Sequence, residues 1–163
     1  MNPAKSEEYL SAIQELYQGE VLGEGLTSRL LSICAAEQKF IVSLLLQVES
    51  EAKIRLRPFL FRLGIPLQED EKMREAGIAF AMTLRDIPWR SAAASLAELS
   101  RPYLARYRLL EAAAPEADRE HVAYMVGHEQ AIVDYFELEA QGRGEEGING
   151  LLALLRYPLS AAG

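Results

Sequence analysis

Residues Val122 to Phe136, VAYMVGHEQAIVDYF, contain the pattern that decides the fold. Apolar side chains recur every three or four residues along this stretch, as they do on one face of an α-helix. Glu129 lies in the middle of that apolar face, where an isolated carboxylate would be costly to bury. The stretch therefore predicts a buried helix and, inside the protein, a group that compensates the charge of Glu129.

Two more helical stretches carry a glutamate at the centre of an apolar face. The residues at helical spacing around Glu20 and Glu49 are Ile13, Leu16, Tyr17 and Thr27 for the first, and Ile41, Leu45, Val48, Ala52 and Leu56 for the second. Apolar faces of helices pack against one another in the core. We therefore expect the three glutamates to converge inside one helical bundle.

Length and composition predict a single domain over residues 1–163, since half of the chain is hydrophobic and its size allows a substantial core. A net charge of -7, without a basic block, argues against a nucleic-acid partner. The single Cys34 cannot form an internal disulfide, and no signal-peptide pattern opens the chain, so we expect a cytoplasmic protein. The apolar run 41–48 is far shorter than the about 20 residues that span a bilayer. We therefore expect no membrane partner.

Capping and turn residues divide the chain into four long helices and two short ones. The residues that mark helix starts or ends are Ser6, Gly64, Pro88, Pro115 and Gly142. A short helix around residues 76–84 would cross over between two helical pairs. A loop over 142–150 would lead into a short terminal helix over 148–157.

The first long helix contains three glycines, at Gly19, Gly23 and Gly25. Each costs about 1 kcal/mol relative to alanine inside a helix. Such a concentration indicates either a kink or an unusually close neighbour, and we favour the close neighbour.

Four long helices in two pairs, joined by a longer middle connection, resemble the ferritin-like superfamily, and specifically rubrerythrin-like bacterial proteins. The resemblance covers about Tyr9 to Gly142. It is strongest in three pieces, which are YQGE over residues 17–20, LQVESE over 46–51 and GHEQ over 127–130. It implies an all-α, ferritin-like four-helix bundle that holds two iron or manganese ions and supports dioxygen-dependent oxidation.

Members of that superfamily hold the ions with one glutamate from each of two helices and a Glu-x-x-His from each of the others. Glu20, Glu49 and Glu129 match the glutamates. The histidines are missing, because Ala52 follows Glu49 by three residues and Ile132 follows Glu129 by three. The resemblance therefore implies an incomplete ligand set.

His128 is the fourth candidate metal ligand. It is adjacent to Glu129 and therefore points about 100° away from it around the helix. Binding the ion that Glu129 binds would need a local helix distortion, so the more ordinary expectation is a partly exposed His128 that binds no metal.

A metal-free network is the alternative to a metal centre. The residues that could donate hydrogen bonds or positive charge to the three acids are Tyr17, Lys53, Ser100, Tyr103 and Tyr107. Two functions thus stay open. One is a degenerate iron or manganese centre that performs oxidation, and the other is a non-catalytic homodimeric bundle that interacts with a protein or binds a small ligand. Enzymatic activity and substrate are left open.

Overall fold

The protein is all-helical in a computed structural model that describes residues 6–157. The α-helices of that range are α1 (Glu7–Ile33), α2 (Lys39–Leu63), α3 (Glu71–Thr83), α4 (Trp89–Ala113), α5 (Arg119–Ala140) and α6 (Glu145–Leu152). Short 3-10 turns at Ala36–Gln38 and Glu116–Asp118 lead into α2 and α5. The predicted all-α class is confirmed. None of the described helices is long and apolar enough to cross a membrane.

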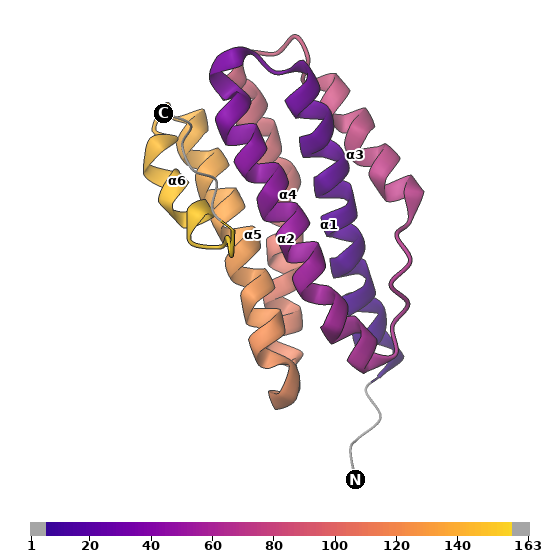
Figure 1. Ribbon diagram of the computed structural model, residues 1–163. Coiled ribbons are helices and arrows are strands. Elements are labelled where there is room, and N and C mark those ends of the chain that lie inside the picture. Colours follow the sequence, from indigo (N-terminus) through magenta and orange to yellow (C-terminus); the bar gives the residue numbers. More distant parts are fainter. Residues whose placement is uncertain (1–5, 158–163) are drawn as a thin grey trace.

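The four long helices pack as two antiparallel pairs, α1 with α2 and α4 with α5 (Figure 1). Contacts of α2 with α5 and of α1 with α4 join the pairs into a ring. The segment after α2 climbs back along the molecule, and α3 follows it against α1 before α4 descends. Helices α2 and α4 consequently run in the same direction. The short helix predicted between the second and third long helices is present as α3.

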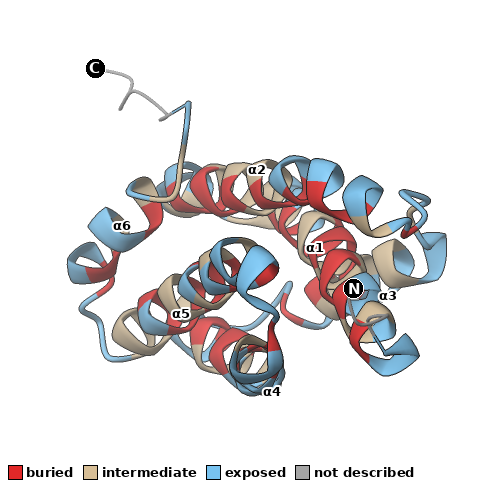
Figure 2. Cartoon of the chain, turned by 90° about the horizontal axis from the view of Figure 1, so that it is seen from below, coloured by how far each residue is buried: buried red, intermediate tan, exposed pale blue. Residues whose placement is uncertain are grey.

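Buried residues lie on the inner faces of the long helices (Figure 2). They form two apolar clusters, one that includes Leu45 and Leu96 and another that includes Leu16, Phe59 and Met125. Burial of apolar surface at roughly 25 cal/mol per Å² is the main force that holds such helices together. In each of α1, α2 and α5, the candidate acid lies in sequence between the residues of one cluster and those of the other. The acids therefore lie near the middle of the bundle.

Most of the residues predicted to mark helix starts or ends lie at or near helix ends in the structure. The Ser6 side chain accepts a hydrogen bond of 3.2 Å from the Tyr9 backbone N–H at the start of α1. Gly64 and Gly142 take φ values of 72° and 76°, a conformation that favours glycine, directly after α2 and shortly after α5.

The C-terminal helix was placed wrongly by the sequence. Helix α6 begins at Glu145 and ends at Leu152, so most of the expected loop over 142–150 is helical. Gly147 lies at the contact of α6 with α5, where a Cβ would lie 2.9 Å from the Tyr135 Cα. The glycine therefore lets α6 pack directly on the backbone of α5.

Two glycines set the close contact between α1 and the crossover helix α3. A Cβ on Gly77 would lie 2.1 Å from the Leu22 carbonyl oxygen, and one on Gly25 would lie 2.6 Å from the Arg74 carbonyl oxygen. The obstacles are backbone atoms, which cannot rotate away. This crossing supports the close-neighbour interpretation of the glycines in the first helix.

Gly77→Ala should therefore lower the free energy of unfolding by about 1–3 kcal/mol, as overpacking of a tight contact does. Gly127→Ala is the matched control, because Gly127 is exposed within α5 and a Cβ there meets nothing within 4 Å. The control should raise stability by up to about 1 kcal/mol, as helix propensity predicts. Urea unfolding of both variants measures the difference, and equal effects would contradict the close contact.

Candidate metal centre

Glu20 from α1, Glu49 from α2 and His128 from α5 meet in the interior of the bundle. The His128 Nε2 atom lies 3.5 Å from Glu20 Oε2 and 3.9 Å from Glu49 Oε2. One ligand atom from each residue falls within 4.8 Å of the other two. Glu20 is 1% exposed and His128 is fully buried. This spacing brings two carboxylates and an imidazole around a volume that a single ion can occupy.

Three polar atoms of this group lack a hydrogen bond of normal geometry. They are Glu20 Oε2 and both imidazole nitrogens of His128. Among the described residues, these are the fully buried side-chain nitrogen and oxygen atoms that have no such hydrogen bond. An unsatisfied buried polar group costs about 1–3 kcal/mol. Such groups are rare in folded proteins and call for a partner. Two of the three, Glu20 Oε2 and His128 Nε2, lie 3.5 Å apart, so a single bound ion could satisfy both.

Glu129 lines the same interior from a different direction. It is 8% exposed and receives a hydrogen bond from Ser100 on α4. His128, its neighbour in sequence, points instead toward α2, where the Val48 main chain lies beside the ring. The two side chains thus diverge as the helical geometry requires.

The expectation of a partly exposed His128 is wrong. Helix α5 contacts α4, α2 and α6, so its buried surface spans more than one apolar stripe. That wide buried arc includes both Glu129, toward α4, and His128, toward α2. His128 reaches Glu20 and Glu49 without sharing a helix face with Glu129.

Burial opposes charge on every member of the group. Desolvation raises the pKa of Glu20 well above its usual range, and the charges of Glu49 and Glu129 raise it further. Desolvation likewise raises the pKa of Glu129 and brings that of Glu49 to about 7. Burial lowers the pKa of His128 to about 4, with partial opposition from the Val48 backbone. The site therefore favours neutral side chains unless a cation enters.

The Glu20 and Glu49 carboxylates lie close enough for a hydrogen bond to link them when Glu20 is protonated, an arrangement that raises the pKa of Glu20 and lowers that of Glu49. Two carboxylates can share such a bond only when one of them carries a proton. A cation would replace that proton and hold both groups ionised. A proton and a metal ion would thus compete for the Glu20 and Glu49 carboxylates.

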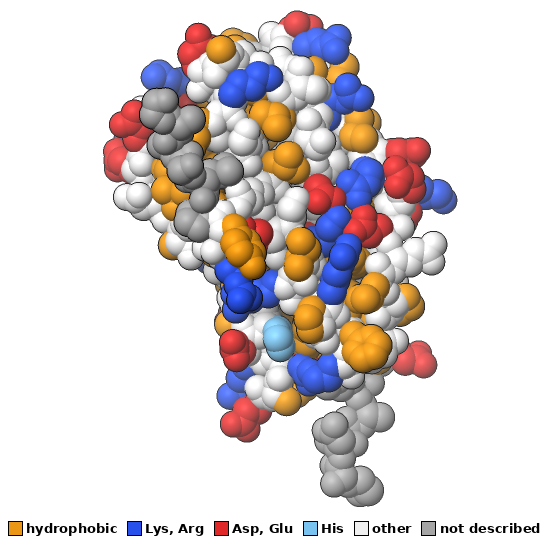
Figure 3. Space-filling model, in the orientation of Figure 1, with side chains coloured by type: hydrophobic (Ala, Val, Ile, Leu, Met, Phe, Trp, Pro, Cys, Tyr) orange, Lys and Arg blue, Asp and Glu red, His pale blue; other side chains and the backbone are white. Residues whose placement is uncertain are grey.

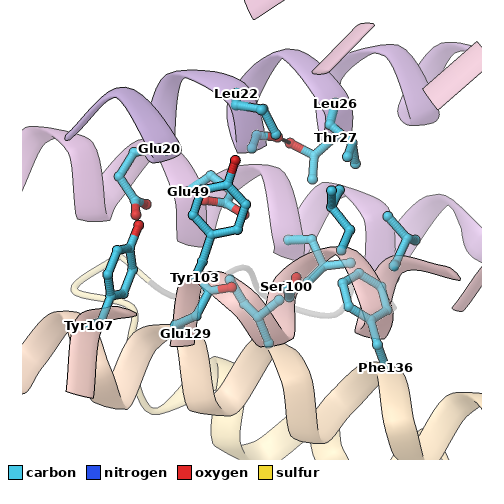
Figure 4. A pocket seen from close by; sticks show the side chains of 16 residues that line it. Glu20, Leu22, Leu26, Thr27, Glu49, Ser100, Tyr103, Tyr107, Glu129 and Phe136 are labelled. Atoms are coloured by element: carbon cyan, nitrogen blue, oxygen red, sulfur yellow. Dashed lines mark hydrogen bonds between the residues drawn. The ribbon is translucent and has the colours of Figure 1, made fainter. Parts of the chain in front are cut away.

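A cavity of about 40 Å³ opens beside the carboxylates (Figure 4). Its walls include the polar residues Glu20, Glu49, Ser100 and Glu129, and most of the other lining side chains are aliphatic or aromatic. The volume exceeds the roughly 10–15 Å³ that one water molecule needs. It is far below the 300 Å³ or more of a typical pocket for an organic ligand. The cavity therefore suits water, dioxygen or a molecule of similar size.

Glycines of α1 make room for the site. A Cβ on Gly23 would lie 2.4 Å from the Glu49 carboxyl carbon, and a Cβ on Gly19 would lie 2.7 Å from the Tyr107 hydroxyl oxygen. Glu49 of α2 and Tyr107 of α4 thus pack against the α1 backbone. A side chain at Gly23 or Gly19 would occupy the same space. At both positions a close neighbour accounts for the glycine, as the sequence predicted.

Three of the five predicted polar partners border the cavity. Ser100 binds Glu129, and Tyr103 and Tyr107 line the cavity wall. Figure 4 shows the Tyr107 hydroxyl pointing toward the Glu20 carboxylate. That hydroxyl donates a hydrogen bond to the Leu16 carbonyl oxygen at 3.5 Å.

The other two predicted partners bind elsewhere. The Tyr17 hydroxyl donates to the Leu67 carbonyl oxygen at 3.3 Å. Lys53 forms ion pairs with Glu24 at 2.5 Å and with Glu69 at 2.8 Å. Both residues lie at the correct helical height but turn toward the segment between α2 and α3. That segment supplies the Leu67 carbonyl oxygen and Glu69 as competing acceptors, and α1 supplies Glu24. A sequence does not reveal this packing.

Glu24 is a charged neighbour of the candidate site that the sequence interpretation missed. Its carboxylate accepts hydrogen bonds from Ser50 at 2.8 Å and from Arg74 at 3.1 Å, and its charge raises the pKa of Glu49. Acidic and basic side chains alternate on the surface in this region (Figure 3). The available signal was its position four residues after Glu20, on the same side of α1.

The donor set has a definite chemical preference. Carboxylate oxygens suit hard cations such as manganese, and imidazole extends that preference to iron. Glu20, Glu49 and His128 could hold one ion, and Glu129 approaches from the far side of the cavity. Comparisons with family models, with curated proteins and with solved structures find no match for the chain.

The raised pKa values of the acids predict how stability changes with pH in chelator-treated protein. Between about 4.5 and about 7, folded Glu49 keeps a proton that the unfolded chain releases, so stability falls as pH rises. Glu20 and Glu129 act in the same direction. His128 acts oppositely between about 4 and 6.5, because the unfolded state alone protonates it there. The three acids outweigh the histidine, so we expect a net loss of stability from pH 5 to 8.

Glu49→Gln should reduce that loss by about 1–3 kcal/mol, since it removes one of the three acids. Glu98→Gln is the control, because Glu98 is exposed on α4. Urea unfolding in chelator at several pH values provides the measurement. A pH dependence that is the same in wild type and Glu49→Gln would argue against a protonated Glu49 in the folded protein.

Proposed function

We propose that the chain is a ferritin-like protein in which Glu20, Glu49 and His128 bind iron or manganese, with Glu129 at the edge of the centre. The observation that carries the proposal is the group of orphaned polar atoms on Glu20 and His128. A folded protein rarely buries an imidazole whose two nitrogens both lack a hydrogen bond of normal geometry. A metal ion is the partner that also suits the adjacent carboxylates.

The arrangement of helices supports the ferritin-like assignment. Two antiparallel pairs joined by a crossover, with acids from separate helices in the middle, are what the resemblance implies. The ligands depart from the superfamily pattern, because the imidazole comes from the residue before Glu129 and Ser100 stands on α4 without a carboxylate at the cavity. We therefore propose a degenerate centre of one ion or of two unequally held ions.

The chemistry we propose is dioxygen-dependent oxidation. A bound iron or manganese ion would supply the redox activity that protein side chains lack. The chain contributes Glu20, Glu49 and His128 as ligands. Largely apolar and aromatic side chains surround them. Glu129, with its hydrogen bond from Ser100, is held where it can keep or release a proton at the cavity. The cavity volume of about 40 Å³ admits dioxygen beside the ligands.

Metal analysis tests the proposal directly. Protein purified without chelator from metal-supplemented cells should contain about one to two equivalents of iron or manganese, as the ligand set implies. His128→Ala and Glu129→Ala should reduce that content, the first by removing a ligand and the second by removing nearby negative charge. Glu98→Gln should retain the wild-type content. A folded wild-type protein without metal would contradict the proposal.

Thermal unfolding provides a second test with its own readout. Added manganese should raise the Tm of wild-type protein, because a ligand that binds only the folded state stabilises it. Glu20→Gln should abolish this rise. In chelator the same substitution should leave stability unchanged or increase it, since it removes a buried acid. Equal shifts with and without metal would count against metal binding.

A metal-free bundle is the second candidate function, favoured by the hydrogen bond that can link Glu20 and Glu49 when Glu20 is protonated. In that state a shared proton replaces the cation, and the protein acts as a non-catalytic homodimer that binds another protein or a small ligand. The same metal analysis separates the two candidates. The homodimer and the cytoplasmic location stay predictions from the sequence.

A further inference from the structure

A surface groove lies between α1 and α4, next to the cavity that borders the carboxylates. These two helices pack less extensively than α1 with α2 or α4 with α5. The groove has a volume of about 340 Å³ and is lined by Leu16 and Leu110, with an ion pair between Glu15 and Arg106 at its rim. Groove and cavity thus lie on either side of one wall.

Two tyrosines of α4 form that wall. Tyr103 and Tyr107 line both the groove and the cavity, and their rings pack edge to face with centroids 6.4 Å apart. Gly19 lets them reach α1, because a Cβ there would lie 2.7 Å from the Tyr107 hydroxyl oxygen and 3.6 Å from the Tyr103 ring. Figure 4 shows both side chains rising from α4 beside the carboxylates. Aromatic rings therefore fill the gap that the helices leave open.

The two tyrosines differ in how firmly they are held. Tyr107 is buried, and its hydroxyl donates to the Leu16 carbonyl oxygen. Tyr103 is half-buried and also lines a second surface hollow, beside Arg106. A partly exposed ring can change rotamer on a much shorter timescale than a buried one. Tyr103 is therefore the part of the wall that can open.

We infer that Tyr103 is the residue that selects, by size, which molecules pass from the α1–α4 groove to the carboxylate cavity. This inference rests on the proposed function for its purpose, since it names the route by which an oxidant reaches the centre. Leu16 and Leu110 line the groove and Glu15 at its rim is paired with Arg106, so the path is largely apolar and disfavours charged molecules. The molecules admitted are small and neutral, such as dioxygen or hydrogen peroxide.

A thiol placed in the cavity measures access without any metal. Thr27 lines the cavity and is 3% exposed, so Thr27→Cys in a Cys34→Ser background reports arrival there. The probes are methyl methanethiosulfonate, which is small and neutral, and N-phenylmaleimide, which is bulky and neutral. Both are larger than the cavity of about 40 Å³, so each reaches the thiol only when the wall opens, and the bulky probe needs the wider opening. Tyr103→Ala should raise the rate of the bulky probe by about tenfold and that of the small probe much less, because the ring no longer has to move aside.

Three further variants separate a gate from general loosening. Tyr103→Phe keeps the ring and should leave both rates unchanged. Tyr103→Leu, which is less disruptive than alanine, should raise the bulky-probe rate by a smaller factor. Leu110→Ala removes a buried groove side chain that does not border the cavity, so it should not change the ratio of the two rates.

The inference is overturned if Tyr103→Ala leaves the ratio of rates unchanged, if Leu110→Ala changes it equally, or if neither probe reaches Thr27→Cys in any variant. Because labelling needs no metal, these outcomes are independent of metal content. A protein that binds metal but fails the labelling test would refute the gate alone. A protein that passes the labelling test but binds no metal would keep the gate and refute the proposed function.

Discussion

The burial of two carboxylates and an imidazole against one another is the constraint on which the rest of the structure depends. Glu20, Glu49 and His128 come from three helices and meet in the interior, where Glu20 and His128 are buried and the Glu49 side chain is 12% exposed. Such a group is stable only with shared protons or with a cation, because like charges in a poorly polarisable interior repel strongly. Its position between two apolar clusters means that the bundle must close around it.

The surrounding helices are shaped to that constraint. Gly23 leaves space for the Glu49 carboxylate, and Gly19 leaves space for the tyrosines that close the gap toward α4. On the outer side, Lys53 neutralises Glu24 and Glu69 and so contributes no positive charge to Glu49. The cationic residue nearest in sequence is thus committed to the α2–α3 segment, and the central acids are left for another partner.

The helices and the inward direction of the three glutamates were predictable, because apolar residues at helical spacing show which face of each helix is buried. The structure places Glu20, Glu49 and Glu129 along one cavity. The role of His128 was not predictable, since it depends on α5 being enclosed by three helices and not by one. Lys53 was assigned incorrectly for a related reason. A long side chain binds whichever acceptor the tertiary packing brings near, and a helical wheel contains no information about that choice.

Anomalous diffraction from a crystal of the manganese-loaded protein tests the central claim most directly. The account predicts a manganese peak about 2.0–2.3 Å from His128 Nε2 and from oxygens of Glu20 and Glu49, the range of ordinary metal–ligand bonds. A cluster without a peak, or peaks confined to exposed acids, would contradict it.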